Sequence, residues 1–179
     1  MEIRIGNMIV GTAGGTAGKG SKTYKVSLPS AWVATMGIDD SKKEIELYFD
    51  GQQITIKKKL SGKEFAEQKR ALQHDVKCLR YFNSDTLCTV IYADFTDKTL
   101  TVENHTSTLV KTAFGKNELP SWDDLTSFLE ERCVPRQREG LQSYLESLGL
   151  DHYDPLDIIR RTGGRMAEDQ QRLTVEDLK

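Results

Sequence analysis

The first sixty residues are divided into short segments by residues that stop regular structure, and this limits the folds open to them. Glycines crowd residues 11–20, Pro29 and Gly37 bound a short apolar segment, and Asp50-Gly51 is a dipeptide that favours tight hairpins. Apolar and polar residues alternate between these breaks, which predicts short β-strands and one short helix. We expect the strands at 3–10, 23–28, 44–49 and 53–58, and the helix at 31–36.

The charge is unevenly divided along the chain. Residues 1–63 hold ten Lys/Arg and six Asp/Glu, a net +4, whereas the remainder stands at −6 and the whole chain at −2. No acidic residue lies between Arg4 and Asp39. This asymmetry indicates one module that meets a polyanion and another that does not, although a solvated basic loop without a partner explains the charge equally well.

Composition sets the broad class of the protein. With 37% hydrophobic and 29% charged residues among 179, the chain is expected to fold, and no apolar run reaches the roughly 20 residues that span a bilayer. The N-terminus lacks a signal-peptide layout, and Cys78, Cys88 and Cys133 show no metal-binding spacing. We therefore expect a cytoplasmic protein with reduced thiols, without a metal or cofactor, and neither a secreted disulfide scaffold nor a zinc finger.

The remainder of the chain reads as a second, acidic module. Residues 63–74 have a helical pattern, and three alternating segments then predict an antiparallel meander at 76–82, 87–95 and 99–103. Helices are expected from the capping-box pattern at Ser121, from Pro135 to Leu148, and from Pro155 to Arg161, with a frayed polar tail from Arg165. The expected domains are 1–60, a helical linker at 61–75, and an α+β partner-binding module at 76–179.

Support for catalysis is thin. The glycine stretch is not a phosphate-binding loop, because Gly18-Lys19 is followed by Gly20 instead of Ser or Thr. His74, His105 and His152 lie in three different elements and outside any known motif. Basic neighbours could activate Cys133, and Arg160-Arg161 could bind an anion, but packing and a helix C-terminus explain them as well. We do not expect an enzyme.

Four segments of the first sixty residues together resemble the AbrB/MazE/SpoVT swapped-hairpin DNA-binding family. The first, Lys25–Ser30, contains a hydrophobic residue followed by proline, and the second, Met36–Ile38, closes a short helix. The other two are the strand segments Glu44–Leu47 and Ile54–Lys58. The resemblance covers residues 3–59, and the order of elements agrees throughout. An unrelated small β-barrel is the alternative.

This resemblance implies a homodimer in which hairpins from two chains interleave into one barrel that binds double-stranded DNA. A thin core in sixty residues agrees with it, because dimerisation would complete the core. The expected DNA-binding residues are the basic Lys19, Lys22, Lys25 and Arg4, with Ser21, Thr23 and Tyr24 as hydrogen-bonding neighbours. Val33-Ala34 replaces an arginine pair frequent in the family, and the first loop is long and glycine-rich, which affects affinity and sequence preference.

The second module resembles, in stretches such as Ile91–Thr96, Val102–Thr106 and Gly164–Asp169, an uncharacterised bacterial family loosely associated with toxin–antitoxin and mobile-element settings. The expected fold is therefore α+β, with an N-terminal dimeric swapped-hairpin barrel followed by a small antiparallel sheet and C-terminal helices. The expected function is a dimeric DNA-binding transcriptional regulator, an autorepressing antitoxin whose second module binds a partner protein, either a toxin or a defence nuclease. The alternative is a mobile-element-encoded, anti-CRISPR-like inhibitor of a nucleic-acid-binding defence protein, with autoregulation by the barrel.

Overall fold

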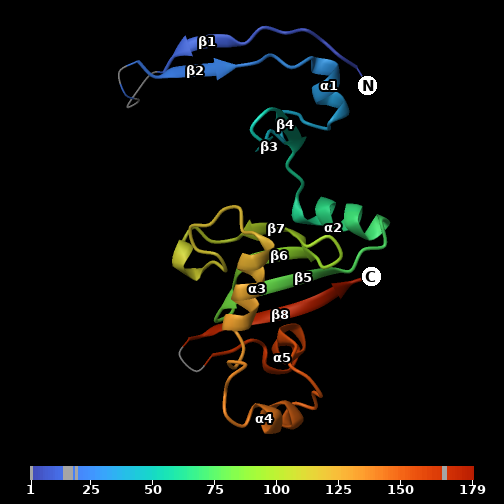
Figure 1. Cartoon of the computed structure of the whole chain (residues 1–179), viewed down its shortest axis with the longest axis vertical. Coiled ribbons are helices and arrows are strands. Elements are labelled where there is room, and N and C mark those ends of the chain that lie inside the picture. Colours follow the sequence, from blue (N-terminus) through green and yellow to red (C-terminus); the bar gives the residue numbers. More distant parts are fainter. Residues whose placement is uncertain (1, 14–17, 19, 167–168) are drawn as a thin grey trace. The chain divides into compact units, whose positions relative to one another are not determined.

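The chain divides into two units, residues 1–59 (unit 1) and 60–179 (unit 2), and both combine helical and antiparallel β-structure (Figure 1). This is a computed structural model, and it describes residues 2–13, 18, 20–166 and 169–179. The expected mixed α+β class is confirmed.

Unit 1 consists of two separate hairpins with a short helix between them. The first hairpin pairs β1 (Ile9–Thr12) with β2 (Lys22–Lys25), and the second pairs β3 (Ile45–Phe49) with β4 (Ile54–Lys58); helix α1 (Ser30–Thr35) lies between β2 and β3 in sequence. The residues that the structure describes form two two-stranded sheets and no closed barrel, so the barrel expected from the sequence is not present within one chain.

Local turn chemistry explains the element boundaries of unit 1. The Asp50 carboxylate accepts hydrogen bonds from the amides of Gln52 and Gln53, both at 2.9 Å, and Gly51 has φ +97°, so the expected hairpin forms. Helix α1 begins directly after Pro29, which occupies the N-cap position, and Gly37 follows it with φ +67°.

The first two expected strands are shorter than the sequence pattern indicated. Residues 3–8 are not in a strand, and β2 ends at Lys25 instead of continuing to residue 28. The alternating segments lack a neighbouring strand there, and alternation without a hydrogen-bonded partner does not define a strand.

Unit 2 is built on one four-stranded antiparallel sheet. Its strands are β5 (Val76–Asn83), β6 (Thr86–Asp94), β7 (Thr99–Asn104) and β8 (Gln171–Leu178), in the order β7-β6-β5-β8. The expected meander is therefore confirmed as β5-β6-β7. The helical elements are α2 (Gly62–Ala71), the short 3₁₀ turn η1 (Leu109–Lys111), α3 (Trp122–Glu131), α4 (Leu141–Ser147) and α5 (Pro155–Thr162).

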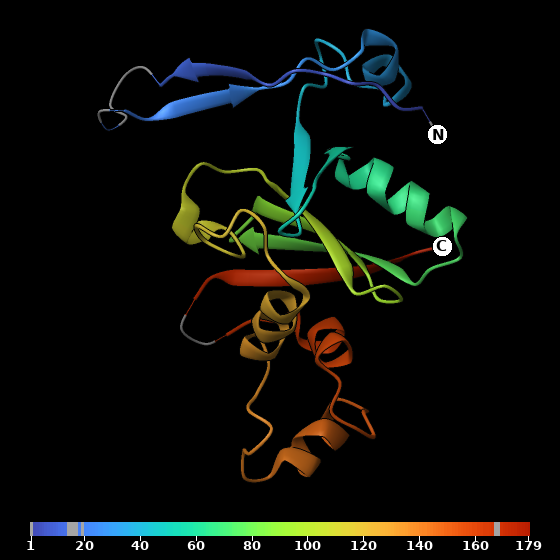
Figure 2. The same ribbon diagram turned by 45° about the horizontal axis from the view of Figure 1, so that its top comes forward.

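Helices cover both faces of this sheet (Figure 2). Helix α2 lies on the face that carries Tyr92, where Gly62 packs directly against the Tyr92 ring. Helices α3 and α5 lie on the opposite face, and the main core is between them and the sheet. Its buried residues are Leu79, Tyr81, Cys88, Ile91, Ala93, Leu125, Phe128, Leu129, Leu156, Ile159 and Leu173.

The segment expected as a helical linker is instead part of unit 2. Ser61 and Glu64 form a reciprocal capping box at the start of α2, and Phe65 and Ala66 are buried. The amide of Gly62 also donates to the Glu103 carboxylate at 2.6 Å. These contacts fasten α2 to the sheet.

Two expectations in the C-terminal part are wrong. The helix expected from Pro135 begins only at Leu141, because Gly140 at its N-cap is left-handed with φ +73°. The tail expected to fray forms β8, which pairs along its whole length with β5 and buries Leu173 completely. By contrast, the capping box at Ser121 and the start of α5 at Pro155 are confirmed.

Buried Arg132 bonds to two residues that precede β8 in the sequence, Gly164 and Asp169. Its guanidinium donates to the carbonyl of Gly164 at 2.9 Å and to the Asp169 carboxylate at 2.7 Å. The pKa of Asp169 is lowered, first by hydrogen bonding from Arg132. A buried, multiply bonded arginine fixes the approach of this strand, and no local sequence pattern encodes that contact.

Candidate nucleic-acid interface

The β1–β2 ribbon carries four of the expected DNA-binding residues, and all four are exposed. Strand β2 consists of Lys22, Thr23, Tyr24 and Lys25. Because neighbouring side chains of a strand point to opposite faces, Lys22 and Tyr24 share one face, while Thr23 and Lys25 share the other. The structure therefore brings the two lysines onto one ribbon but not onto one surface.

Ser21, another of the expected DNA-binding residues, directly precedes β2. Ser21 accepts a hydrogen bond from the amide of Ala13 at 2.9 Å and donates its own amide to the carbonyl of Gly18 at 3.0 Å. Gly20 has φ +94°, a conformation that side-chain-bearing residues rarely adopt. Lys19 lies outside the described residues.

Arg4 belongs to a different part of unit 1. Its guanidinium carbon lies 5.7 Å from the centre of the Trp32 ring, within cation–π range, and the Trp32 indole donates to the Glu2 carboxylate at 2.6 Å. Arg4 is thus placed beside α1, away from the strand pairing that positions Lys22 and Lys25.

The second hairpin has one apolar and one polar face. The cross-strand pairs Leu47–Ile56 and Phe49–Ile54 lie on the same face, and Leu47, Phe49 and Ile54 are 65%, 71% and 63% exposed. On the other face Tyr48 donates to Glu46 at 2.6 Å. None of the residues described in unit 1 is buried, so this face has no cover within its own unit.

The ribbon exposes one lysine of β2 on each of its faces. A two-stranded ribbon fits the major groove of B-DNA, and exposed ammonium groups neutralise phosphates without reading sequence. The hydroxyls of Thr23 and Tyr24 add hydrogen-bonding groups on both faces. Lysines supply salt-dependent affinity, and base discrimination would come from the neighbouring polar side chains.

Unit 2 holds a separate charged cluster around buried Asp94. Asp94 accepts hydrogen bonds from His74 Nδ1 at 2.8 Å and from Lys69 Nζ at 3.0 Å, and Lys69 also contacts Asp97 at 2.7 Å. His74, Asp94 and Asp97 are close enough to ligate one metal ion, with ligand atoms within 4.8 Å of one another. The Lys69 ammonium contacts both carboxylates and His74 contacts Asp94, so the groups of this cluster are hydrogen-bonded to one another.

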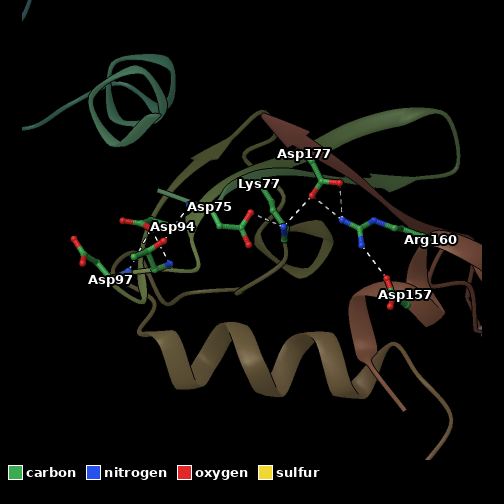
Figure 3. A network of polar contacts seen from close by, with 8 residues as sticks. Asp75, Lys77, Asp94, Asp97, Asp157, Arg160 and Asp177 are labelled. Atoms are coloured by element: carbon green, nitrogen blue, oxygen red, sulfur yellow. Dashed lines mark hydrogen bonds and ion pairs between the residues drawn. The ribbon is translucent and has the colours of Figure 1, made fainter. Parts of the chain in front are cut away.

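A chain of ion pairs links two strands to α5 (Figure 3). Lys77 Nζ contacts Asp75 at 2.7 Å and Asp177 at 2.9 Å, and Arg160 contacts Asp177 at 2.7 Å and Asp157 at 2.9 Å. Sequence reasoning left Arg160 open as an anion-binding residue. The structure uses its guanidinium to fasten α5 to β8, so it is not free for an anion.

Cys133 lacks the surroundings of a reactive thiol. Burial, followed by the charges of Asp154 and Glu130, raises its pKa to about 11, and its sulfur lies 3.6 Å from the carbonyl of Pro155. The thiol is protonated at neutral pH, whereas a nucleophilic cysteine needs a thiolate. The basic neighbours noted in the sequence do not overcome these effects.

The sequence indicated no role for Lys69, Asp94 or Asp97, because their partners come from separate elements and show no motif spacing.

No helix among the described residues has the length and apolarity needed to cross a bilayer. Comparisons with protein-family models, with curated proteins and with solved structures find no match to this chain.

Proposed function

We propose that this protein is a dimeric DNA-binding regulator, an antitoxin that represses its own operon through unit 1 and holds a toxin through unit 2. One observation carries the proposal: the described part of unit 1 has no buried residue and combines exposed apolar strands with an exposed basic ribbon. Such a unit needs a partner to form a core, and its charge favours a polyanion.

The apolar face of β3–β4 is the argument for a second copy. A lone two-stranded hairpin is marginally stable in water. While the side chains of Leu47, Phe49 and Ile54 are exposed, they contribute no hydrophobic free energy to the stability of the hairpin. Interleaving with the same hairpin of another chain would bury this face, as the resemblance to the swapped-hairpin family implies. The interface would be self-complementary and closed, as a two-fold dimer requires.

The basic ribbon and the net positive charge of the first segment support binding to DNA. Residues 1–63 carry a net +4, and Lys22 and Lys25 are exposed and form no ion pair among the described residues. In a dimer these charges would be repeated about the two-fold axis, as the two half-sites of an operator require.

DNA binding by the full chain tests the proposal. We expect Lys22→Ala with Lys25→Ala to weaken binding to a short random-sequence duplex and to reduce the slope of log K against log salt by roughly 0.9 for each phosphate that the variant no longer neutralises. The matched control, Lys111→Ala with Lys116→Ala, removes the same charge from unit 2 and should leave the slope unchanged. Equal slopes for both variants would refute the assignment.

A second function has support in the charge of unit 2. Residues 60–179 carry 21 acidic and 16 basic residues, a net −5, which suits an inhibitor that occupies the nucleic-acid site of a defence nuclease. Binding of the full chain to such a nuclease, with competition by added duplex, would favour this function. Binding to a toxin that duplex does not displace would favour the antitoxin.

A further inference from the structure

A small apolar cleft opens in unit 2 beside α3. Its apolar lining consists of Phe95, which directly follows β6, of Trp122, Leu125 and Leu129 of α3, and of Leu156 of α5. The Phe95 and Trp122 rings meet edge to face, with centroids 4.9 Å apart and planes at 83°. Since the rings and the buried leucines are held by the main core, the cleft is a preformed feature of the fold.

The size of the cleft limits what can occupy it. Its volume is about 210 Å³. Small-molecule sites usually enclose roughly 300–1,000 Å³, so this cleft suits one large side chain better than a free ligand. Aromatic-lined pockets that accept a single anchor side chain are typical of the binding hot spots of protein–protein interfaces.

The rim of the cleft carries one carboxylate, that of Asp154, without an ion pair among the described residues. It carries Glu130, Asp154 and Arg136, and Arg136 is already engaged by Glu130 at 2.9 Å and by the Tyr153 ring at 4.2 Å. Asp154 caps α5 by accepting the amide of Asp157 at 3.0 Å and has no cationic partner among the described residues. A partner that places a cation beside its anchor side chain would complement the carboxylate of Asp154.

We propose that this cleft is the partner-binding site of unit 2, and that it takes a large aromatic or aliphatic side chain flanked by lysine or arginine on a partner protein. The inference rests on the proposed partner-binding role of unit 2. The anchor side chain fills the space over Trp122 and Leu129, and the flanking cation pairs with Asp154.

Selection from a phage-displayed random peptide library against the full chain tests the site. We expect enrichment of peptides with an aromatic or leucine residue next to a basic one. Thr126, exposed at the edge of the cleft, provides the blocking variants: Thr126→Trp fills the space and Thr126→Lys places a cation at the rim. Each should reduce binding of the selected peptides by at least tenfold, whereas Ser127→Trp, on the same helix but outside the lining, should not.

The charge of the rim has its own variant. Asp154→Asn keeps a residue that caps helices well and removes the charge. Loss of one partly exposed ion pair should weaken the selected peptides by roughly two- to fivefold at low salt and less at high salt. Circular dichroism and urea midpoints of each variant establish that the fold is retained.

Several outcomes would overturn the inference. They are a library that enriches no such peptides, binding that survives both Thr126 variants, and a Thr126→Trp variant that alters the oligomeric state, which would place a second copy in the cleft. DNA binding of the same variants separates this inference from the proposed function. If DNA binding is intact and peptide binding fails, only the cleft assignment is wrong; if the full chain never binds DNA, the regulator proposal fails independently.

Discussion

Replacing Asp94 with asparagine removes one buried charge with little change of shape. Burial by itself would raise the pKa of Asp94, but hydrogen bonds from His74, Lys69 and the amides of Asp97 and Thr96 lower it from 3.8 to about 2. Each pKa unit corresponds to about 1.4 kcal/mol, so the ionised carboxylate contributes about 2 kcal/mol to the free energy of unfolding at pH 7. We expect Asp94→Asn to lower the free energy of unfolding at pH 7 by about 2 kcal/mol.

The pH dependence follows from the direction of this shift. Because the folded pKa lies below the unfolded one, the contribution of Asp94 is fully present well above pH 4 and is lost as the pH falls through about 2. The difference between the wild-type protein and Asp94→Asn should therefore shrink to roughly half by pH 3.

Urea unfolding monitored by tryptophan fluorescence measures the effect. The chain has two tryptophans, so a Trp32→Phe background leaves Trp122, in unit 2, as the reporter. All variants are compared at one protein concentration, since dimerisation would make the midpoints depend on it. Asp97→Asn is the control: its carboxylate is 50% exposed and shares the Lys69 contact, and it should cost under about 1 kcal/mol.

Two results would refute this reasoning. One is an Asp94→Asn variant as stable as the wild type at pH 7, which would mean that the network around this carboxylate contributes no net stability. The other is a loss that stays constant from pH 7 to pH 3, which would mean that the damage comes from altered packing and not from the missing charge.

Three further substitutions test other contacts of the structure. Gly62→Ala should destabilise unit 2 by about 1–3 kcal/mol, because a methyl group would overlap the Tyr92 ring; protection of α2 amides from hydrogen exchange should fall with it. Arg132→Met should cost about 3 kcal/mol in urea unfolding, because it leaves Asp169 partly buried without its cation, and equal stability would contradict this role. Leu47→Asp should convert a dimer into monomers of 20.2 kDa in sedimentation experiments, and an unchanged mass would exclude the β3–β4 face from the interface.

Local chemistry made part of the fold predictable. The hairpin at Asp50-Gly51 and the helix start at Ser121 depend on hydrogen bonds between residues within three positions of one another. The meander of β5, β6 and β7 is similarly local, because short turns join strands with a clear alternation. These elements could be predicted from the sequence since every interaction that defines them lies within the same segment.

The candidate site was predictable only in part. The sequence identified exposed basic residues in 22–25, but the strand alternation that separates Lys22 from Lys25 matters only once the pairing of β2 is known. The position of Arg4 beside Trp32 joins residues 28 positions apart and has no local signal. The dimer and its DNA contact remain predictions, which duplex binding and sedimentation can test.

The basic, thin-cored first segment and the acidic second one follow from the order of residues alone, because charge and composition add up residue by residue. Two features became visible only in the folded chain. They are the pairing of β8 with β5 at the edge of the sheet and the contacts of Lys69 and His74 with Asp94. The same holds for the cleft beside Trp122. Strand pairing, buried ion pairs and clefts depend on which distant segments pack together, and that choice is made by the free energy of the whole fold and not by any single segment.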